Sequence, residues 1–277
     1  MIGGSLGLAV REKKLAASVT GVDTDAAALK MAASLGAVDE GATDLKKALY
    51  GAGLVVLATP VGRFRTIAKE MSASLSRGAV VTDVGSVKGE MVPELESDLS
   101  PEGRFVGGHP IAGREKSGVS AASPDLFNGS ACILTPTKKT DPEALAAVRS
   151  LWESVGSRVT EMDPGRHDRV LGAVSHLPHV AAFALVNLLT DLKGPDPDLL
   201  DYTAGGFRDF TRIAASSPEM WRDILLANRK AVAELIDRYR GELDALKKLI
   251  EGGDPAGLKK TLDRASAARE GLDPKGK

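Results

Sequence analysis

Short apolar runs and longer stretches with helical spacing alternate along the first half of the chain. Runs rich in Val, Ile, Leu and Ala, typical of buried strands, occur at residues 18–22, 54–58, 79–82, 104–106, 131–134 and 158–162. Helix-like stretches lie between several of them, at 24–35, 61–75, 88–99 and 141–155. Short continuous apolar strands that alternate with helices indicate a mostly parallel sheet covered on both faces.

The second half of the chain changes character near Asp163-Pro164. From about residue 165 to 250 the apolar spacing is helical, and no convincing strand is found. Residues 165–192 are predicted as one long helix, interrupted or kinked at Pro178. We therefore expect an α/β domain over residues 1–163, followed by an all-α domain over residues 164–277.

Residues 219–250 carry one apolar stripe at spacings of three and four residues, which predicts a single helix of about eight turns. A stripe of this length packs either within its own domain or against another subunit, and periodicity alone gives the two even odds. After Gly252-Gly253 we expect a polar tail, with mobile residues at 271–277.

Composition limits the classes of function. The 277-residue chain has a formal net charge of −1 and is 43% hydrophobic, which suits one large or two modest soluble domains. A charge near zero and only 4% aromatic residues argue against a nucleic-acid-binding surface. No uninterrupted run of 18 apolar residues occurs, and the single Cys132 excludes an intrachain disulfide. We expect a cytoplasmic protein that binds neither nucleic acid nor membrane.

The chain opens with MIGGSLGLAV, in which Gly3-Gly4 precedes a helix-like stretch that includes Ser5 and Leu6. Asp23 follows 20 residues after Gly3, at the end of the SVTGV run. In a dinucleotide-binding unit, a glycine turn brings a helix N-terminus to the pyrophosphate, and an acidic residue after the second strand binds the ribose hydroxyls. A carboxylate there favours NAD over NADP, because a 2′-phosphate would meet a like charge. The alternative is a merely flexible Gly-Gly, since the motif is incomplete.

Three predicted strands end in residues suited to ligand contact. These residues are Thr59-Pro60, Ser86 within DVGSVKG, and His109 within FVGGHPIAG. Ligands of parallel α/β sheets bind at the carboxyl ends of the strands, so these side chains are expected to share one crevice. His109 is fixed by Pro110 and is well placed to handle a proton. Ordinary turn chemistry and helix capping are the alternatives for Thr59-Pro60 and Ser86.

The helical half contains Ser175-His176-Leu177-Pro178-His179, whose two histidines lie three residues apart and could share a helix face. A metal site would need a third ligand, and the sequence offers no further His/Cys cluster. A polar ligand contact or a hydrogen-bonded core histidine is therefore expected instead of a metal centre.

Arg208 and Arg212 lie four residues apart in GGFRDFTR, so on a helix they would point the same way. Two guanidinium groups can bind two carboxylates through paired hydrogen bonds. The alternative is a surface network with Asp209, although the adjacent glycines and two phenylalanines argue against a solvated face.

Together these motifs resemble the prephenate dehydrogenase family of tyrosine biosynthesis. The segments that carry the resemblance are DVGSVKG, GGHPIAG-REKSG, SHLPH and GGFRDFTRIA, and it extends from residue 1 to about 250. It implies a Rossmann-like NAD-binding domain followed by an all-α domain that forms a homodimer. The apolar stripe at 219–250 would then have an intersubunit role.

The resemblance implies an oxidoreductase that uses NAD to convert prephenate to 4-hydroxyphenylpyruvate and CO2. It implies that His109 is the catalytic residue that contacts the ring hydroxyl, with Ser86 between His109, cofactor and substrate. Arg212 would bind a substrate carboxylate. The substrate pocket implied by the family comprises Ser175, His179, Arg208, Arg212 and Glu115, with Glu115 at its gate.

Two features depart from the family pattern. Position 114 is Arg, where similar sequences often carry Thr or Ser, and no role is assigned to it. The first strand and the first two cofactor glycines of the family would precede Met1, so we expect a chain truncated by roughly ten residues at its N-terminus. Loss of that central strand would expose two strand edges and weaken NAD binding.

Three other functions stay open on the sequence. An arogenate dehydrogenase would use the same chemistry on a substrate with an amino group in place of the keto group. A truncated, non-catalytic dimeric module would bind substrate analogues at Arg212 without turnover. A generic hydroxyacid or imine dehydrogenase on a similar scaffold would leave the motifs around His109 and Arg212 unexplained.

Overall fold

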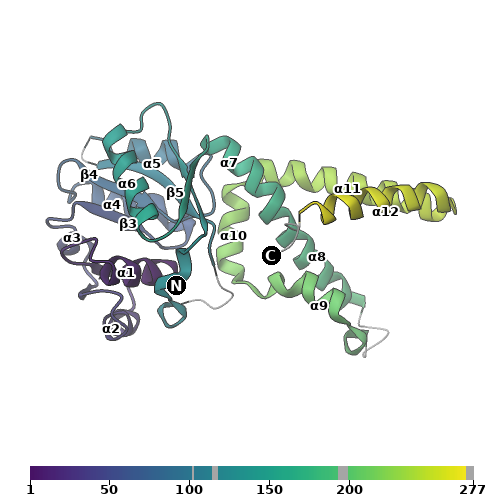
Figure 1. Cartoon of the computed structure of the whole chain (residues 1–277), viewed down its shortest axis with the longest axis horizontal. Coiled ribbons are helices and arrows are strands. Elements are labelled where there is room, and N and C mark those ends of the chain that lie inside the picture. Colours follow the sequence, from purple (N-terminus) through teal and green to yellow (C-terminus); the bar gives the residue numbers. More distant parts are fainter. Residues whose placement is uncertain (102, 114–117, 193–198, 273–277) are drawn as a thin grey trace. The chain divides into compact units, whose positions relative to one another are not determined.

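The computed structural model describes residues 1–101, 103–113, 118–192 and 199–272 (Figure 1). Its contacts divide the chain into two compact units, Met1–Arg229 and Lys230–Lys277. The domain boundary predicted after residue 163 lies inside the first unit and stays a prediction.

The strands of the first unit form two sheets. A small sheet pairs β1 (Thr20–Val22) with β2 (Glu40–Ala42) in parallel. The larger sheet has the order β3-β4-β5-β6-β7, with bounds Leu54–Leu57, Ala79–Asp83, Gly103–Pro110, Ala131–Thr135 and Arg158–Glu161. Its neighbouring strands are parallel except for β5 and β6. The predicted α/β class with a mostly parallel sheet is confirmed.

Helices lie before and between these strands, and all but α3 agree with the predicted apolar spacing. They are α1 (Ile2–Glu12), α2 (Ala26–Ser34), α3 (Leu45–Ala48), α4 (Phe64–Ser72), α5 (Met91–Leu99) and α6 (Pro142–Ser154). Aspartate side chains accept backbone N–H groups at the starts of α2, α3 and α6. β2 and α3 were not predicted, because each is too short and too exposed to leave a periodic pattern.

Successive residues of β4 pack in two separate apolar clusters, because side chains of a strand point alternately to the two faces of the sheet and this strand is buried on both. Val80 packs in a cluster with residues of α1 and α6, including Leu6 and Trp152. Val81 packs in a second cluster with residues of α4 and α5, including Phe64. Full burial of one such large side chain stabilises the fold by about 1.5–3 kcal/mol. The sheet is thus held rigidly between two helical layers.

After residue 163 the described residues form helices and no strand. They are α7 (Pro164–Leu171), a π-helical turn (Gly172–His176), α8 (Leu177–Leu192), α9 (Gly205–Thr211) and α10 (Pro218–Ala227). The irregularity of the predicted helix at 165–192 therefore precedes Pro178. Pro178 has no N–H for the carbonyl of Val174, and its ring crowds that carbonyl, so the preceding turn widens.

The prediction of one continuous helix at 219–250 is wrong. The structure has two helices there, α10 and α11 (Arg229–Glu251), separated by a break at Asn228, where the backbone has φ −105° and ψ 26°. The polar segment expected after Gly252-Gly253 forms a helix, α12 (Pro255–Glu270), capped by Asp254, and of the residues predicted to be mobile, 273–277 lie outside the described residues. In the second unit, Arg264 of α12 pairs with Glu242 of α11 at 3.4 Å.

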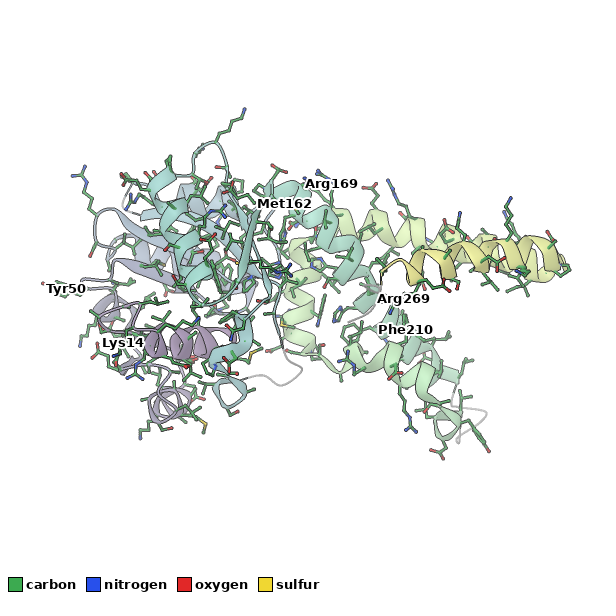
Figure 2. The ribbon with its side chains drawn as sticks, in the orientation of Figure 1. Lys14, Tyr50, Met162, Arg169, Phe210 and Arg269 are labelled. Carbon is green, nitrogen blue, oxygen red and sulfur yellow. The ribbon has the colours of Figure 1, made fainter. Side chains whose placement is uncertain are left out.

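The helices after residue 163 expose apolar side chains, including the labelled Phe210, which is 46% exposed (Figure 2). The helix over Pro164–Leu192 is long and apolar enough to cross a membrane by length and composition alone, with a mean hydropathy of 1.4. Only 22% of its most apolar window is buried. A large exposed apolar surface of this kind is typical of an interaction site.

Candidate active site

His109 lies within β5 and not in a loop after it. The first part of β5 pairs with β4 as far as Thr82 opposite Val106, and the second part pairs antiparallel with β6, where His109 lies opposite Ile133. β5 therefore extends beyond the carboxyl end of β4 and carries His109 with it. The predicted strand at 104–106 was too short, because Gly107-Gly108 has the composition of a turn.

The two glycines before His109 are required by close packing. A Cβ atom on Gly107 would lie 2.7 Å from Val92 Cγ2. A Cβ atom on Gly108 would lie 2.8 Å from the carbonyl oxygen of Asp83. Since real Cβ atoms do not approach so closely, β5 passes its neighbours at this point only with glycine.

A buried ion pair fixes the loop after β4 that carries Ser86. The fully buried Asp83 and Lys88 side chains meet at 2.5 Å. Asp83 also accepts the N–H groups of Gly85 at 2.8 Å and Gly108 at 3.0 Å. Burial raises the pKa of Asp83 and lowers the pKa of Lys88, and in each case the charge of the other residue opposes the shift. The network holds the half-buried Ser86 loop against β5.

His109 is joined to a second histidine that sequence analysis did not single out. His109 Nδ1 lies 2.9 Å from Nε2 of His167, and His167 Nδ1 lies 2.9 Å from Oδ1 of Asp168. His167 and Asp168 are neighbours on α7 and are both buried. Nothing in the sequence around His167 and Asp168 indicates that they contact His109, because they lie on a helix after the last strand of the sheet.

Burial is the main cause that lowers the pKa of His109 well below its ordinary value, and the positive charge of Lys88 lowers it further. His109 is therefore a neutral imidazole at physiological pH. Burial also lowers the pKa of His167, although the hydrogen bond to Asp168 opposes the shift. Burial raises the pKa of the nearby Cys132 to about 12, so that side chain is a thiol.

Asp168 ties α7 to the loop after β4. Its two carboxylate oxygens accept the backbone N–H groups of Lys88 and Gly89, each at 2.7 Å. Its own carbonyl oxygen accepts the side chain of Asn228 at 2.9 Å, and the Asn228 amide nitrogen lies 3.0 Å from His176 Nδ1. These contacts account for the helix break at Asn228, which brings a short polar side chain into a buried network.

His176 and His179 take different positions. His176 is 1% exposed, and burial lowers its pKa to about 4, while the Asp168 charge opposes that shift. His179 Nδ1 donates to the carbonyl oxygen of Ser175 at 2.9 Å, and its ring stacks on Trp221 with 3.7 Å between centroids. Among the described residues, no group of three or more His, Cys, Asp or Glu side chains could hold a metal ion.

The Ser86 loop reaches the helical residues through apolar packing. Val87, the residue after Ser86, packs with Trp221 and Ile224 of α10. Because Trp221 also stacks on His179, the structure brings the neighbourhood of Ser86 and that of His179 together. The Ser86 backbone also interacts with His176.

Arg208 lies on α9, and Arg212 begins the 3-10 turn that follows it. Both side chains are exposed. The turn of Arg212 packs against α8, the helix of His179. Their role in binding carboxylates stays a prediction, and Glu115 and Arg114 lie outside the described residues.

Gly3 and Gly4 were predicted to precede the first helix, but they lie inside α1, which begins at Ile2. A Cβ atom on Gly3 would lie 2.9 Å from Cβ of Ala58, the residue before Thr59. Gly3 therefore lets α1 pack closely against the end of β3, whereas a Cβ atom on Gly4 would lie 2.9 Å from Cγ2 of Val119.

The other predicted cofactor residues divide into two groups. Ser5 is fully buried and its hydroxyl accepts the N–H of Ser123 at 3.0 Å, while Leu6 belongs to the core, so neither presents a side chain to a ligand. Asp23 is exposed after β1, and Thr59 and Pro60 are exposed after β3. Burial lowers the pKa of the Met1 amino group, and the negative charge of Asp23 opposes that shift, so Asp23 lies near the start of α1.

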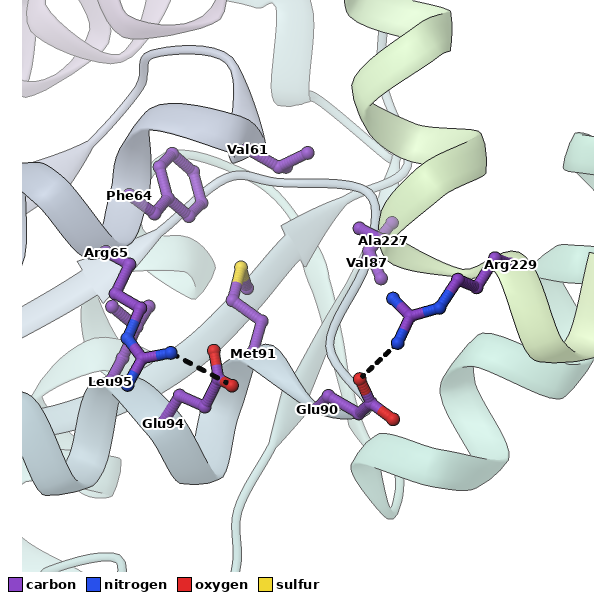
Figure 3. Close-up of a pocket in the computed structure, with 10 residues that line it drawn as sticks. All are labelled: Val61, Phe64, Arg65, Val87, Glu90, Met91, Glu94, Leu95, Ala227 and Arg229. Atoms are coloured by element: carbon purple, nitrogen blue, oxygen red, sulfur yellow. Dashed lines mark ion pairs between the residues drawn. The ribbon is translucent and has the colours of Figure 1, made fainter.

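A separate cavity of about 290 Å³ opens in the first unit (Figure 3). Arg65 pairs with Glu94 at 3.3 Å and Arg229 pairs with Glu90 at 3.7 Å, and Figure 3 marks both ion pairs with dashed lines. Val87 lines this cavity, but no predicted site residue does. The cavity is therefore distinct from the cluster around His109.

The chain is similar to prephenate dehydrogenases in both of its halves. The family model described as prephenate dehydrogenase, nucleotide-binding domain, matches residues 6–161. The model described as prephenate dehydrogenase, dimerization domain, matches residues 163–264. Prephenate dehydrogenase of Bacillus subtilis (strain 168) is 36% identical over 277 residues, a match that covers 98% of this chain and 74% of the relative.

Two solved structures show the same likeness over nearly the whole chain. Prephenate dehydrogenase from A. aeolicus, in complex with hydroxyphenyl propionate and NAD+, matches with a TM-score of 0.93 and 45% identity, covering 98% of this chain and 95% of its own. Synechocystis arogenate dehydrogenase matches with a TM-score of 0.81 and 31% identity, covering 98% and 96%. With both family models matched in order, the chain belongs to the prephenate dehydrogenase family.

Proposed function

We propose that this chain is an NAD-dependent dehydrogenase that converts prephenate to 4-hydroxyphenylpyruvate and CO2 in tyrosine biosynthesis. The observation that carries the proposal is the buried, neutral His109 at the carboxyl end of the sheet, beside the Ser86 loop. A neutral imidazole in this position is suited to take a proton from a substrate hydroxyl. The relatives named prephenate dehydrogenase, at 36% and 45% identity, support the choice of substrate.

The start of α1 fits the pyrophosphate of a dinucleotide. Backbone N–H groups of Gly3 and Gly4 lie in the first turn of the helix, where they are not used within it. The exposed Asp23 lies near this helix end and suits the ribose hydroxyls of NAD, while Thr59 and Pro60 lie at the neighbouring strand end. The A. aeolicus relative binds NAD+. When bound, NAD+ supplies the acceptor for the substrate hydride.

His109 manages the proton of the ring hydroxyl during oxidation. As hydride leaves the carbon that bears the hydroxyl, a carbonyl forms, and the proton moves to His109. Loss of the ring carboxylate as CO2 then leaves its electron pair in the ring, which becomes aromatic, and the phenolate oxygen takes the proton back from His109 to give the phenol. Ser86 lies on the loop beside His109, where it orients the reacting groups.

The substrate also carries two carboxylates that need partners. We assign one to Arg212, with Arg208 nearby, because guanidinium groups bind carboxylates through paired hydrogen bonds. Ser175, His179 and Glu115 complete the proposed pocket.

We infer a homodimer formed by the helices after residue 163. The exposed apolar surface of Pro164–Leu192 supplies the kind of face that a second subunit covers. The match to a family dimerization domain over residues 163–264 supports this inference. We also propose a cytoplasmic location without membrane or nucleic-acid partners, as suits an enzyme of amino-acid biosynthesis.

The test is formation of NADH from prephenate by the wild-type chain and by His109→Asn. We expect the variant to lose turnover by about 10²–10⁴-fold, with its circular dichroism spectrum and dimer elution unchanged. Near-normal turnover in the variant would show that the role assigned to His109 is wrong.

Three further assays separate the alternatives. Arogenate dehydrogenase is the second candidate, supported by the likeness to the Synechocystis enzyme, and the ratio of kcat/KM for the two substrates decides between them. Activity with simple hydroxyacids would favour a generic dehydrogenase. Binding of a substrate analogue at Arg212 without turnover would favour a non-catalytic module.

A further inference from the structure

We propose that His167 and Asp168 fix the tautomer of His109, so that Nδ1 carries the hydrogen and Nε2 is the nitrogen that receives the substrate proton. The catalytic meaning of this assignment rests on the proposed function. The tautomer itself is a property of the protein alone and can be measured without substrate.

Asp168 is a hydrogen-bond acceptor at both of its carboxylate oxygens. Each of its carboxylate oxygens accepts a backbone N–H, one from Lys88 and one from Gly89, both at 2.7 Å. A carboxylate held by two such donors is an acceptor toward its third neighbour as well. His167 Nδ1, 2.9 Å from Asp168 Oδ1, is therefore the donor of that contact.

The tautomer of His167 determines the tautomer of His109. Burial keeps His167 neutral, so its one ring hydrogen is on Nδ1 and its Nε2 has a lone pair. His109 Nδ1 lies 2.9 Å from that Nε2 and must donate to it. Since His109 is also neutral, its Nε2 carries no hydrogen. The lone pair of Nε2 can therefore accept the proton of the substrate hydroxyl.

The same contacts prepare His109 for the charge it gains. When Nε2 takes a proton, the new positive charge is shared with an Nδ1–H that already points at the acceptor nitrogen of His167. The carboxylate of Asp168 lies behind His167, in a site where all three side chains are buried. Hydrogen bonds to a charged group are stronger than those between neutral groups, so this contact strengthens as the proton moves. His167 and Asp168 act through His109 and are positioning residues.

Simple packing is the competing explanation for His167. The His109 and His167 rings meet edge to face with 5.1 Å between centroids, and an apolar side chain of similar size could fill the same space. A matched pair of variants separates the two roles. His167→Gln keeps an acceptor that can reach His109 Nδ1, whereas His167→Met has nearly the same length and shape without a strong acceptor.

The first experiment records the ring nitrogens of the four histidines by ¹⁵N NMR of the free full-length protein, with signals assigned by single substitution. We expect His109 and His167 both as Nδ1–H tautomers in the wild type. We expect His109 to keep this tautomer in His167→Gln and to lose it in His167→Met. An Nε2–H tautomer of His109 in the wild type would overturn the proposal.

The second experiment compares kcat and KM for prephenate with NAD+ at saturation. We expect His167→Met to lower kcat by about 10- to 100-fold with little change in KM, because the lost contact strengthens only in the transition state. His167→Gln should recover most of that loss. Equal kcat values for the two variants, or a change confined to KM, would refute the positioning role. Wild-type protein that has the expected tautomers but does not oxidise prephenate would refute the proposed function and leave the tautomer assignment intact.

Discussion

Replacing Lys88 with methionine should strongly destabilise the first unit. Methionine matches much of the lysine stem but lacks the ammonium group that meets Asp83 at 2.5 Å. The variant leaves a fully buried carboxylate with only the N–H groups of Gly85 and Gly108. The carbonyl oxygens of Gly85 and Val87 lose the same donor.

The size of the effect follows from the imbalance that the substitution creates. Removing one partner of a buried ion pair costs about 3–5 kcal/mol, because the remaining charge stays out of water without compensation. We expect a value in this range, which is a large fraction of the 5–15 kcal/mol typical of a whole domain. The double variant Asp83→Asn/Lys88→Met removes both charges, so it should be less destabilised than Lys88→Met alone.

The assay is urea unfolding at one fixed protein concentration, since dimer dissociation contributes to the apparent stability. Lys47→Met is the matched control in the same unit, because Lys47 is 85% exposed and lies 4.0 Å from Asp44. The control should lose no more than about 0.5 kcal/mol. A loss below about 1 kcal/mol in Lys88→Met, or a double variant as unstable as the single one, would refute the argument from an uncompensated charge.

Three further predictions concern pH and packing. Burial holds the pKa of His176 at about 4 in the folded chain against an ordinary value of 6.5, so the unfolded state binds more protons and stability should fall as pH drops from about 6.5 to 4. This residue alone accounts for roughly 3 kcal/mol, and urea unfolding of His176→Asn should show a flatter dependence; an unchanged slope would contradict it. Because burial also lowers the pKa of His109, kcat/KM for prephenate should show no loss centred near 6.5 on acidification, and a limb there would contradict a neutral His109. Gly108→Ala places a Cβ atom 2.8 Å from the Asp83 carbonyl oxygen and should cost about 1–3 kcal/mol and lower kcat, whereas Gly53→Ala meets no atom within 4 Å. Equal stability and turnover in these two variants would show that the close approach at Gly108 does not matter.

Most of the α/β architecture could be predicted, because strands buried on both faces leave continuous apolar runs. β3, β4 and β6 begin at the predicted residues, 54, 79 and 131. The prediction failed where tertiary contacts outweigh local composition. Gly107-Gly108 has turn composition, yet β5 continues through it, because glycine is the residue that fits between Asp83 and Val92.

The helix break at Asn228 shows a limit of periodicity. Polar Asn228 and Arg229 occupy the positions three and four residues after Leu225, but the apolar stripe resumes at Val232 with the same period, so periodicity alone predicts one unbroken helix. The reason lies far along the chain, in the hydrogen bond from Asn228 to the carbonyl of Asp168 and in its contact with His176.

The catalytic candidate could be found from sequence, but the residues that support it could not. His109 stands out through its glycines and Pro110. His167 is separated from it by 58 residues and lies on a helix whose polar residues suggest a solvated face. The role of His109 can be predicted from the residues next to it in the sequence. The role of His167 depends on a contact with a distant residue, so it can be recognised only in the folded structure.

Lys88 is the point at which the two halves of the site are joined. Its ammonium group donates to Asp83 at the end of β4, and its backbone N–H donates to Asp168 on α7. Asp83 holds Gly108 directly, and Asp168 acts on His109 through His167. The two carboxylates thus fix the same loop from the two matched domains, residues 6–161 and 163–264.

This connection crosses the family boundary after residue 161 and lies within the compact unit Met1–Arg229 (Figure 2 labels Met162, at the boundary, and Arg169, on α7 after it). A buried polar network is costly when it is only partly satisfied, so the loss of either carboxylate would leave buried N–H groups without acceptors. The helices after residue 163 therefore do more than supply a dimer surface. They complete the hydrogen bonds that orient His109, and a substitution on α7 should alter proton transfer at β5 without touching the substrate.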